Sequence, residues 1–299
     1  MLEKSFDNRG KENYHRGPAA RLLAKATTEL AAAGVEDARL DAEILLAHAC
    51  QCSRAELLCG AHDIDEEARE RFEAMIGRRR RREPVAYILG YKEFYSLEIR
   101  VAPSVLIPRP ETESVVSAAL ELIGNRPGLR LCDIGTGSGA IALAIAANLP
   151  TAKITATDIS SEALLIARDN AARLRVLSRV DFRLADCWEP LDNVEPIGTF
   201  DLIVSNPPYV QDNEIELLAP EIRCYEPRLA LSGGFDGLKF YRRIATQLRQ
   251  YIHKGGFVVL EIGAAQATAV SEIMIAAGAV GVNLKSDLAG LPRVVVAAF

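Results

Sequence analysis

The stretch Leu131-Cys-Asp-Ile-Gly-Thr-Gly-Ser-Gly-Ala140 decides the fold class of this 299-residue chain. It begins as a short apolar strand, continues through three glycines in five positions, and runs into an apolar helix that begins near Ala140. Glycines let the backbone turn sharply and approach a ligand closely, at the carboxyl edge of a sheet. Because Gly135, Gly137 and Ala140 also match the loose dinucleotide pattern G-x-G-x-x-A, the loop alone leaves the kind of ligand open.

Apolar strands and helical runs alternate on both sides of this loop, from Glu111 to the C-terminus. The alternation predicts an α/β fold, a doubly wound and mainly parallel sheet covered by helices on both faces. No helical run separates the last two strands, which favours a final antiparallel pair at the edge of the sheet. The predicted strands span residues 129–134, 153–157, 180–184, 200–205, 256–261, 281–285 and 294–299, and predicted helices include 140–148 and 162–174.

The N-terminal part of the chain carries a helical pattern and no strand pattern. It predicts a small helical bundle over residues 18–84, preceded by a flexible polar segment at residues 1–17. The predicted helices cover residues 19–33 and 38–50, then a short run that starts at Ser53 and a longer one that starts at Asp65.

Residues 85–110 predict a hairpin or an extended linker between the bundle and the α/β domain at residues 111–299. Apolar residues, Phe94 among them, alternate here with polar ones, as in a short hairpin. Several prolines then disfavour helix until Glu111.

Composition and charge narrow the class of protein. Hydrophobic residues make up 49% of the chain, which is ordinary for a globular protein. The net charge is -5 and the pI is about 5.6, so a nucleic-acid partner is not favoured. The six cysteines form no CxxC pair, and we expect no metal site. The first 17 residues do not resemble a signal peptide, and no apolar run reaches membrane length. We expect a cytoplasmic protein that does not associate with membranes.

Acidic residues follow the second and third predicted strands. Asp158 can accept both hydroxyls of an adenosine ribose, in a nicotinamide cofactor or in S-adenosylmethionine, or it can cap the next helix. Asp186 can receive the amino group of an adenine, with Cys187 or Trp188 beside the ring, or it can cap its loop. Both positions predict a site for an adenosine-containing ligand.

The fourth predicted strand runs directly into Asn206-Pro-Pro-Tyr209. The two prolines stiffen the bend and remove two N–H donors, which leaves the Asn206 side-chain oxygen and the Pro207 carbonyl as acceptors. These acceptors suit a planar NH2 group, and the ring of Tyr209 can lie against a flat substrate. Such a nitrogen is a poor nucleophile, so positioning it against a strong electrophile is the chemistry that this bend favours. A sulfonium methyl group is that electrophile, which favours S-adenosylmethionine over a redox cofactor.

The chain resembles the glutamine methyltransferases that modify class 1 peptide chain release factors. The likeness runs from about Ala19 to Phe299, with a conservative change to IPRPETE from the usual IPRPDTE. The resemblance implies a class I methyltransferase fold with a mainly parallel, seven-stranded sheet, and a helical domain that docks the substrate protein. The segments that carry it are Arg82–Gly90 (REPVAYILG), Glu93-Phe94, Leu106–Glu113 (LIPRPETE), the loop GTGSG and NPPY.

The activity that the resemblance implies is methyl transfer from S-adenosylmethionine to the side-chain amide nitrogen of the glutamine in the release factor's Gly-Gly-Gln motif. It assigns catalysis to Asn206, Pro207 and Tyr209, with Pro208 completing a substrate clamp. Phe94 and Arg109 lie in a segment that borders the cleft in the family. The implied cofactor residues are Gly135, Thr136, Gly137, Ser138, Gly139, Asp158, Asp186, Cys187, Trp188 and Asn206.

Several alternatives stay open at this point. The family often has an aromatic residue directly after the third-strand acid, whereas this chain has Cys187 and then Trp188, so which of them faces the adenine is undecided. Arg109 can meet the methionine carboxylate or the substrate backbone, or it can form an interdomain salt bridge. Other candidate functions are methylation of a ribosomal-protein glutamine, methylation of an adenine amino group in DNA or RNA, and S-adenosylmethionine sensing without catalysis. We expect a monomer.

Overall fold

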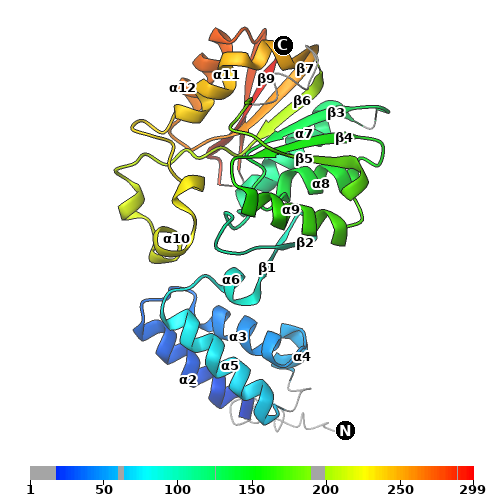
Figure 1. Cartoon of the computed structure of the whole chain (residues 1–299). Coiled ribbons are helices and arrows are strands. Elements are labelled where there is room, and N and C mark those ends of the chain that lie inside the picture. Colours follow the sequence, from blue (N-terminus) through cyan, green and yellow to red (C-terminus); the bar gives the residue numbers. More distant parts are fainter. Residues whose placement is uncertain (1–17, 60–63, 125, 190–198, 288) are drawn as a thin grey trace, which may run out of the picture. The chain divides into compact units, whose positions relative to one another are not determined.

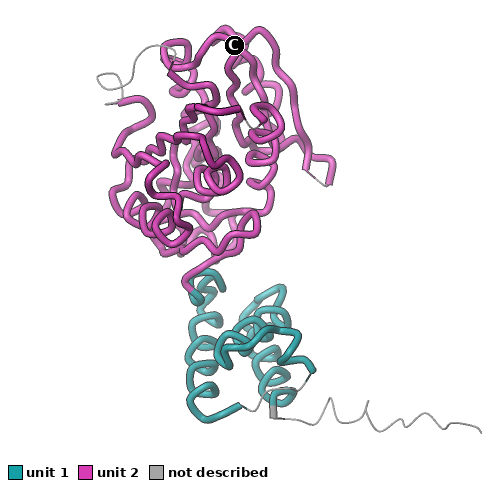
Figure 2. The backbone as a smooth tube through the Cα atoms, turned by 90° about the vertical axis from the view of Figure 1, so that its right-hand side faces the viewer, with its two compact units in different colours: residues 1–89 teal, residues 90–299 magenta. Residues whose placement is uncertain are grey.

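A computed structural model describes residues 18–59, 64–124, 126–189, 199–287 and 289–299. The chain divides into two compact units, residues 1–89 and residues 90–299, shown in teal and magenta in Figure 2. The predicted flexible segment at residues 1–17 lies outside the described residues.

The first unit is a helical bundle. The Ser53 side chain accepts a hydrogen bond from the backbone N–H of Glu56, and Asp65 does the same for Ala68, so both predicted starting residues cap helices. The apolar side chains of these helices form one buried cluster that includes Leu30, Leu45 and Phe72. The helices are α2 (Pro18–Ala32), α3 (Ala38–Ala49), α4 (Arg54–Leu58), α5 (Glu66–Arg80) and α6 (Val85–Leu89).

Helix α6 departs from the expected linker. The sequence predicts hairpin or extended chain from residue 85, whereas residues 85–89 form a helix whose Ile88 is buried in the core cluster of the bundle. Tyr87 and Ile88 are both buried, so this short apolar run is helical because it packs there. The compact unit therefore ends at Leu89, five residues beyond the predicted boundary at residue 84.

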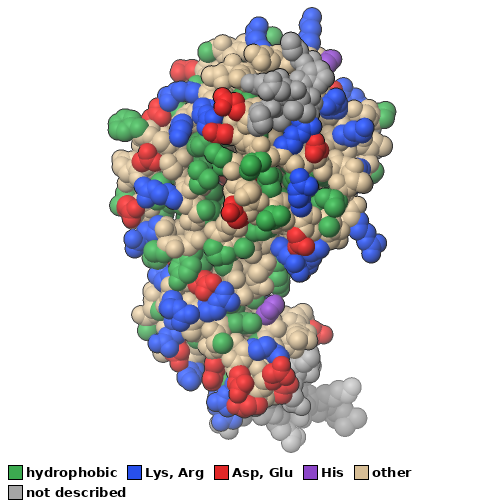
Figure 3. Space-filling model, in the orientation of Figure 1, with side chains coloured by type: hydrophobic (Ala, Val, Ile, Leu, Met, Phe, Trp, Pro, Cys, Tyr) green, Lys and Arg blue, Asp and Glu red, His purple; other side chains and the backbone are tan. Residues whose placement is uncertain are grey.

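Two arginines of the run at the end of α5 form ion pairs within the helical bundle. Arg79 is buried and its Nε donates to Asp41 Oδ2 over 2.7 Å, and the Arg78 Nη2 donates to Glu83 Oε1 over 2.5 Å. Figure 3 shows basic and acidic side chains interspersed on the face that the view presents. These contacts account for two of the arginines as structural ion pairs rather than as a basic surface.

The second unit begins with the predicted hairpin and continues as an α/β sheet (Figure 1). The hairpin strands are β1 (Tyr91–Phe94) and β2 (Leu97–Arg100), followed by a 3-10 turn at Pro110–Thr112 and by α7 (Glu113–Ile123). The sheet strands are β3 (Arg130–Ile134), β4 (Lys153–Asp158), β5 (Val180–Leu184), β6 (Phe200–Ser205), β7 (Ile252–Glu261), β8 (Gly281–Ser286) and β9 (Pro292–Ala298).

In the described part of the chain, the seven sheet strands lie in the order β5-β4-β3-β6-β7-β9-β8. Neighbours from β5 to β7 are parallel, and β9 is antiparallel to both β7 and β8. This confirms the doubly wound, mainly parallel sheet with an antiparallel pair at its edge. Because β4 and β6 lie on opposite sides of β3, the strand order switches beside β3, and a crevice forms there at the carboxyl ends of the strands.

Alternating side chains bury the two faces of the sheet in separate clusters. Leu202 and Val204 of β6 lie in the cluster with α7, α8 (Ala140–Asn148) and α9 (Ser161–Arg173), whereas Ile203 lies in the cluster with α11 (Lys239–Tyr251) and α12 (Ala267–Ala276). Figure 1 shows these two helical layers flanking the sheet. The unit thus has its own core, distinct from the cluster of the helical bundle.

No helix within the described ranges has both the length and the apolar character needed to cross a membrane. None of the six cysteines, all of which lie in the described ranges, forms a disulfide, and Cys132 and Cys187 are buried.

Candidate active site

A cavity of about 370 Å³ lies at the carboxyl ends of the strands around the switch point. Its wall includes the glycine loop after β3, Asp158 at the end of β4, the residues after β5, and Asn206 after β6. Phe240, Arg243 and Ile244 of α11 complete it on the other face of the sheet. The cavity size and its mixture of apolar walls with a few polar groups are typical of a small-molecule site.

The glycine loop lines the cavity through its first four residues, Gly135 to Ser138. Gly135 and Gly137 have φ of 72° and 55°, and a Cβ atom on either would meet no protein atom within 4 Å. The space that those Cβ atoms would occupy is open, so a ligand can approach the backbone closely.

Gly139 has a different role from the other loop glycines. It is not part of the cavity wall. It is the N-cap residue of α8 and has a φ of 85°. A Cβ there would lie 3.0 Å from Leu143 Cδ1 and 3.2 Å from Ala167 Cβ, so this glycine permits close packing of α8 against α9.

The buried Asp133 carboxyl forms hydrogen bonds with the glycine loop and with α8. Asp133 Oδ2 accepts hydrogen bonds from Thr136 Oγ1 over 2.6 Å and from the backbone N–H of Ala142 over 3.2 Å. Burial raises the pKa of the Asp133 carboxyl to about 7. The predicted cofactor residue Thr136 is therefore held by Asp133 as well as lining the cavity.

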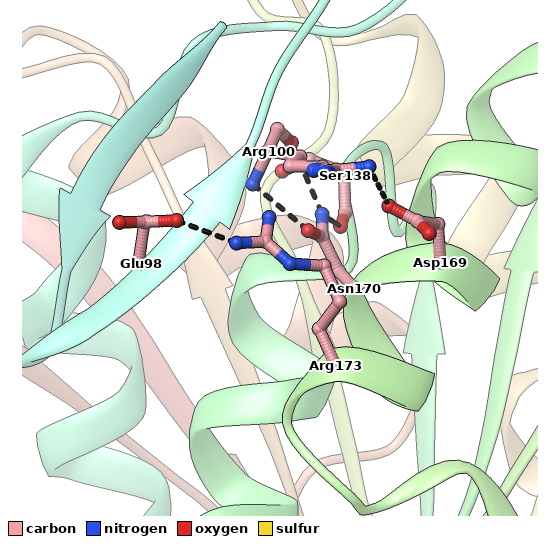
Figure 4. Close-up of polar contacts among 6 residues, drawn as sticks. All are labelled: Glu98, Arg100, Ser138, Asp169, Asn170 and Arg173. Carbon is pink, nitrogen blue, oxygen red and sulfur yellow. Dashed lines mark hydrogen bonds and ion pairs between the residues drawn. The ribbon is translucent and has the colours of Figure 1, made fainter.

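Asn170 of α9 ties the glycine loop to the hairpin (Figure 4). Its Nδ2 donates to the backbone oxygens of Ser138 over 2.9 Å and Arg100 over 3.0 Å, and its Oδ1 accepts from the Arg100 N–H over 2.8 Å. Ion pairs Arg100–Asp169 and Arg173–Glu98 flank this buried amide. Sequence reasoning did not identify Asn170, since a mid-helix Asn carries no signal of such a role.

Asp158 lies at the cavity as predicted, and it is the last residue of β4. Its Oδ2 accepts from the Gly137 N–H over 2.8 Å and its Oδ1 from the Ser160 N–H over 2.9 Å. The Ser160 side chain caps α9 instead, because it accepts a hydrogen bond from the Ala163 N–H. Burial raises the pKa of the Asp158 carboxyl, which lines the cavity and keeps lone pairs that can accept from hydroxyl donors.

After β5, the structure brings Asp186 and Cys187 to the cavity but not Trp188. The Trp188 ring is stacked on Tyr251 at a centroid distance of 4.6 Å, and its Nε1 donates to the Ile244 oxygen over 2.9 Å. Of the two residues left open as a neighbour of an adenine, Cys187 lies at the wall. Trp188 does not. Its large ring is buried in the core, where its N–H also has a hydrogen-bond acceptor.

Cys187 and Asp186 contribute differently to the wall. Burial raises the pKa of the Cys187 thiol to about 11, so this side chain is a neutral apolar surface. Asp186 accepts a hydrogen bond from Arg243 Nη1 over 2.7 Å. This pairing orients a carboxyl at the cavity.

The Asn206-Pro-Pro-Tyr209 turn contributes its first three residues to the cavity. The Asn206 Nδ2 donates to Thr112 Oγ1 over 3.1 Å, which leaves Oδ1 as an acceptor. Tyr209 is not part of the wall; its hydroxyl donates to Glu261 Oε1 over 3.3 Å, and its backbone oxygen accepts from Gln266 Nε2 over 3.0 Å. Tyr209 therefore anchors the turn.

Two predicted substrate residues lie away from the cavity. Phe94 is 1% exposed and packs in the sheet core, because the alternation of the hairpin turns it inward. Arg109 Nη2 donates to Glu226 Oε1 over 2.5 Å. This salt bridge lies within the second unit, so it is neither interdomain nor a cavity contact.

Sequence reasoning also missed Thr112, Glu261 and Arg243 near the cavity. Thr112 lines the wall, and Glu261 is buried at the end of β7 beside the NPPY turn. Arg243 comes from α11. Glu261 had a readable signal, since a carboxylate at the carboxyl end of a strand next to β6 falls on the ligand edge of the sheet.

The described residues contain no group of three or more His, Cys, Asp and Glu side chains that could hold a metal ion. The cavity has features that fit an adenosine-bearing sulfonium instead: open space over two glycines, an acidic group for hydroxyls, and apolar walls for a planar base.

Comparisons with known proteins agree with this geometry. Residues 21–90 match the family model described as the PrmC N-terminal domain, and residues 117–223 match the methyltransferase small domain. The catalytic domain of hMettl16, in complex with MAT2A 3'UTR hairpin 6, is 17% identical with a TM-score of 0.55, covers 69% of this chain and 76% of that chain, and shows the fold alone.

Curated relatives match almost the full length. The release factor glutamine methyltransferase of Cereibacter sphaeroides is 44% identical over 93% of this chain and 98% of its own length. The protein of the same name from Koribacter versatilis is 41% identical over 91% of this chain and 95% of its own length. The glycine loop, the NPPY turn and this full-length similarity together establish that the chain belongs to the release factor glutamine methyltransferase family.

Proposed function

We propose that this protein transfers a methyl group from S-adenosylmethionine to the side-chain amide nitrogen of the glutamine in the Gly-Gly-Gln motif of class 1 peptide chain release factors. The observation that carries the proposal is the Asn206 carboxamide, which lines the same cavity as the glycine loop and keeps Oδ1 as an acceptor. The family relationship supports the choice of glutamine as the substrate group.

The cofactor is assigned to the wall on the glycine-loop side. The backbone of Gly135 to Ser138 and the Asp158 carboxylate suit the methionine and ribose parts, and Ile159, Ala185 and Cys187 suit a flat base. When bound, S-adenosylmethionine supplies an electrophilic methyl group on its sulfonium. Gly139 acts on this site through helix packing and through its N–H, which donates to the Thr136 oxygen over 2.8 Å.

The substrate amide is assigned to the NPPY turn. The Asn206 Oδ1 and the Pro207 carbonyl each accept one hydrogen of the amide NH2, which holds its nitrogen toward the methyl donor. The prolines keep this pair of acceptors at a fixed separation because they restrict the backbone. Tyr209 contributes through its hydroxyl contact with Glu261 rather than through the cavity wall.

The partner and its docking extend the proposal. The helical unit would dock the release factor, the protein would act as a monomer in the cytoplasm, and nucleic acid would not be a substrate. The NPPY motif suits a glutamine amide of either a release factor or a ribosomal protein, so the substrate assay includes both.

The experiment supplies labelled S-adenosylmethionine to the protein with release factor, ribosomal protein or DNA in separate reactions. Label on the release factor, and its loss when the motif glutamine is changed to alanine, is the expected result. Asn206→Ala should abolish transfer while the cofactor still binds and the melting temperature stays close to wild type. Label on DNA, or wild-type turnover by Asn206→Ala at saturating cofactor, would overturn the proposal.

A further inference from the structure

The proposed chemistry leaves one buried carboxyl beside the NPPY turn without a role. Glu261 is 2% exposed and ends β7. Because Leu260 pairs with Ser205 in the parallel ladder, Glu261 lies next to Asn206 at the carboxyl edge of the sheet. Among the described residues its Oε2 has no hydrogen-bond partner, and a buried carboxyl in such a state calls for an explanation.

Two polar groups of the site meet this carboxyl. The Tyr209 hydroxyl donates to Oε1 over 3.3 Å, and the Thr112 hydroxyl lies near enough to lower the pKa of the carboxyl. Thr112 in turn accepts from the Asn206 Nδ2 over 3.1 Å. Its own hydrogen can be donated to the unpartnered Oε2 of Glu261, so the three residues Glu261, Thr112 and Asn206 can form a continuous relay from the core to the cavity wall.

The relay has a direction because a threonine hydroxyl carries a single hydrogen. When that hydrogen is donated to an ionised carboxylate, the hydroxyl oxygen can only accept from Asn206. The carboxamide must then present its NH2 to Thr112 and its oxygen to the cavity. If the carboxyl were neutral, Thr112 could donate to Asn206 instead, and the carboxamide could turn its NH2 toward the substrate, where it would repel another NH2 group.

We propose that Glu261 and Thr112 are positioning residues that hold the Asn206 carboxamide with its oxygen toward the substrate amide. The inference rests on the proposed function, since it explains how the acceptor in that chemistry keeps its orientation. Neither residue touches the reacting atoms; both act through Asn206.

The surroundings of Glu261 determine how the relay responds to pH. Burial raises the pKa of the Glu261 carboxyl to about 7, while the Thr112 and Tyr209 hydroxyls act in the opposite direction. Orientation of Asn206 should therefore be lost as the pH falls through about 7. The charged and titratable groups that interact with this carboxyl are Glu111 before α7, Arg293 of β9, Tyr209 and Tyr241 of α11.

Matched variants test the relay in the release-factor assay. Thr112→Val keeps the shape and removes the hydroxyl, and should lower kcat about 10- to 100-fold with the cofactor KM changed by less than about twofold. Thr112→Ser restores a hydroxyl and should recover most of kcat. Glu261→Gln should lower kcat about tenfold or more and remove its dependence on pH between about 6 and 8. Glu272→Gln, on the exposed side of α12, controls for loss of one charge.

The outcomes separate the relay from the proposed function. If wild type methylates the release factor and both Thr112→Val and Thr112→Ser are as active as wild type, the relay is wrong and the proposed function stands. If wild type methylates no release factor, the proposed function fails first. Equal loss in Thr112→Val and Thr112→Ser, with an unchanged pH profile in Glu261→Gln, would mark a merely structural role and also overturn the relay. Melting temperatures and cofactor Kd show that each variant is folded.

Discussion

The Asp158 carboxylate accepts a hydrogen bond from the Gly137 N–H over 2.8 Å. Gly137 is in the middle of the glycine loop after β3, and Asp158 ends the neighbouring strand β4. The contact joins the two parts of the predicted cofactor site into one unit. Asp158 therefore sets the loop conformation in addition to presenting lone pairs to the cavity.

Asp158→Ala should weaken cofactor binding more than it slows methyl transfer. It removes hydrogen bonds to a charged acceptor, each worth about 1.5–3 kcal/mol, and it releases the Gly137 N–H. Titration calorimetry with the methyl donor or its demethylated product measures the change in Kd. Asp181→Ala, an exposed acid on β5, is the control. An unchanged Kd would mean that Asp158 serves only the loop.

Trp188→Phe should destabilise the protein without weakening cofactor binding. The change removes the Nε1 hydrogen bond to the Ile244 oxygen and part of the stack on Tyr251, so a loss of about 1–3 kcal/mol is expected. Urea denaturation measures the stability, and calorimetry measures the Kd. Cys187→Leu, at the cavity wall, should raise the Kd for the cofactor and leave the stability close to that of wild type. A Kd raised tenfold by Trp188→Phe would return this ring to the cofactor site.

Arg109→Ala should destabilise the second unit strongly. The Glu226 side chain is 1% exposed, and without Arg109 its carboxylate would be buried with only the Ile107 N–H as a remaining partner. Breaking such a pair costs about 3–5 kcal/mol, and replacing both members with Met and Leu should cost less. Urea denaturation of the single and double variants checks this. If Arg109 instead holds substrate, its loss would raise KM and leave stability unchanged.

Stability of the ligand-free protein should fall as the pH rises from about 4 to about 7, through Asp133. Burial raises the pKa of this carboxyl from its ordinary value of 3.8 to about 7, so the folded state binds the proton more tightly. Its contribution to stability is complete below about pH 4 and is lost as the pH rises through about 7. Asp133→Asn should flatten this part of the curve of unfolding free energy against pH, measured by urea denaturation. A wild-type curve that rises from pH 5 to 8 and is unaffected by Asp133→Asn would contradict the prediction.

Removing residues 1–89 should leave a folded domain that binds cofactor. The second unit has its own apolar clusters and contains the whole cavity wall. Methylation of intact release factor should drop steeply, because a single glutamine loop offers little surface for recognition. The comparison is kcat/KM for whole release factor against a short peptide that carries the motif. An unchanged kcat/KM for the whole factor would show that the helical unit does not dock it.

The sequence by itself determined the layers of the fold and the edge of the sheet that carries the site. Strand alternation, the glycine loop and the acid at the end of β4 are local patterns, and local patterns suffice where parallel strands end at one edge. The positions of Gly135, Asp158 and Asn206 at the cavity followed directly from being the residues just after β3, at the end of β4 and after β6.

Only the tertiary structure decided which of the remaining side chains reach the cavity. Trp188 and Phe94 turn into the core, Arg109 pairs with a distant Glu226, and Thr112 meets Asn206 across 94 positions of sequence. Such choices depend on burial and on hydrogen-bond partners that come from other elements, and no local pattern encodes them. A buried polar group must find its partner in the folded chain, so its role is settled by packing rather than by its neighbours in sequence.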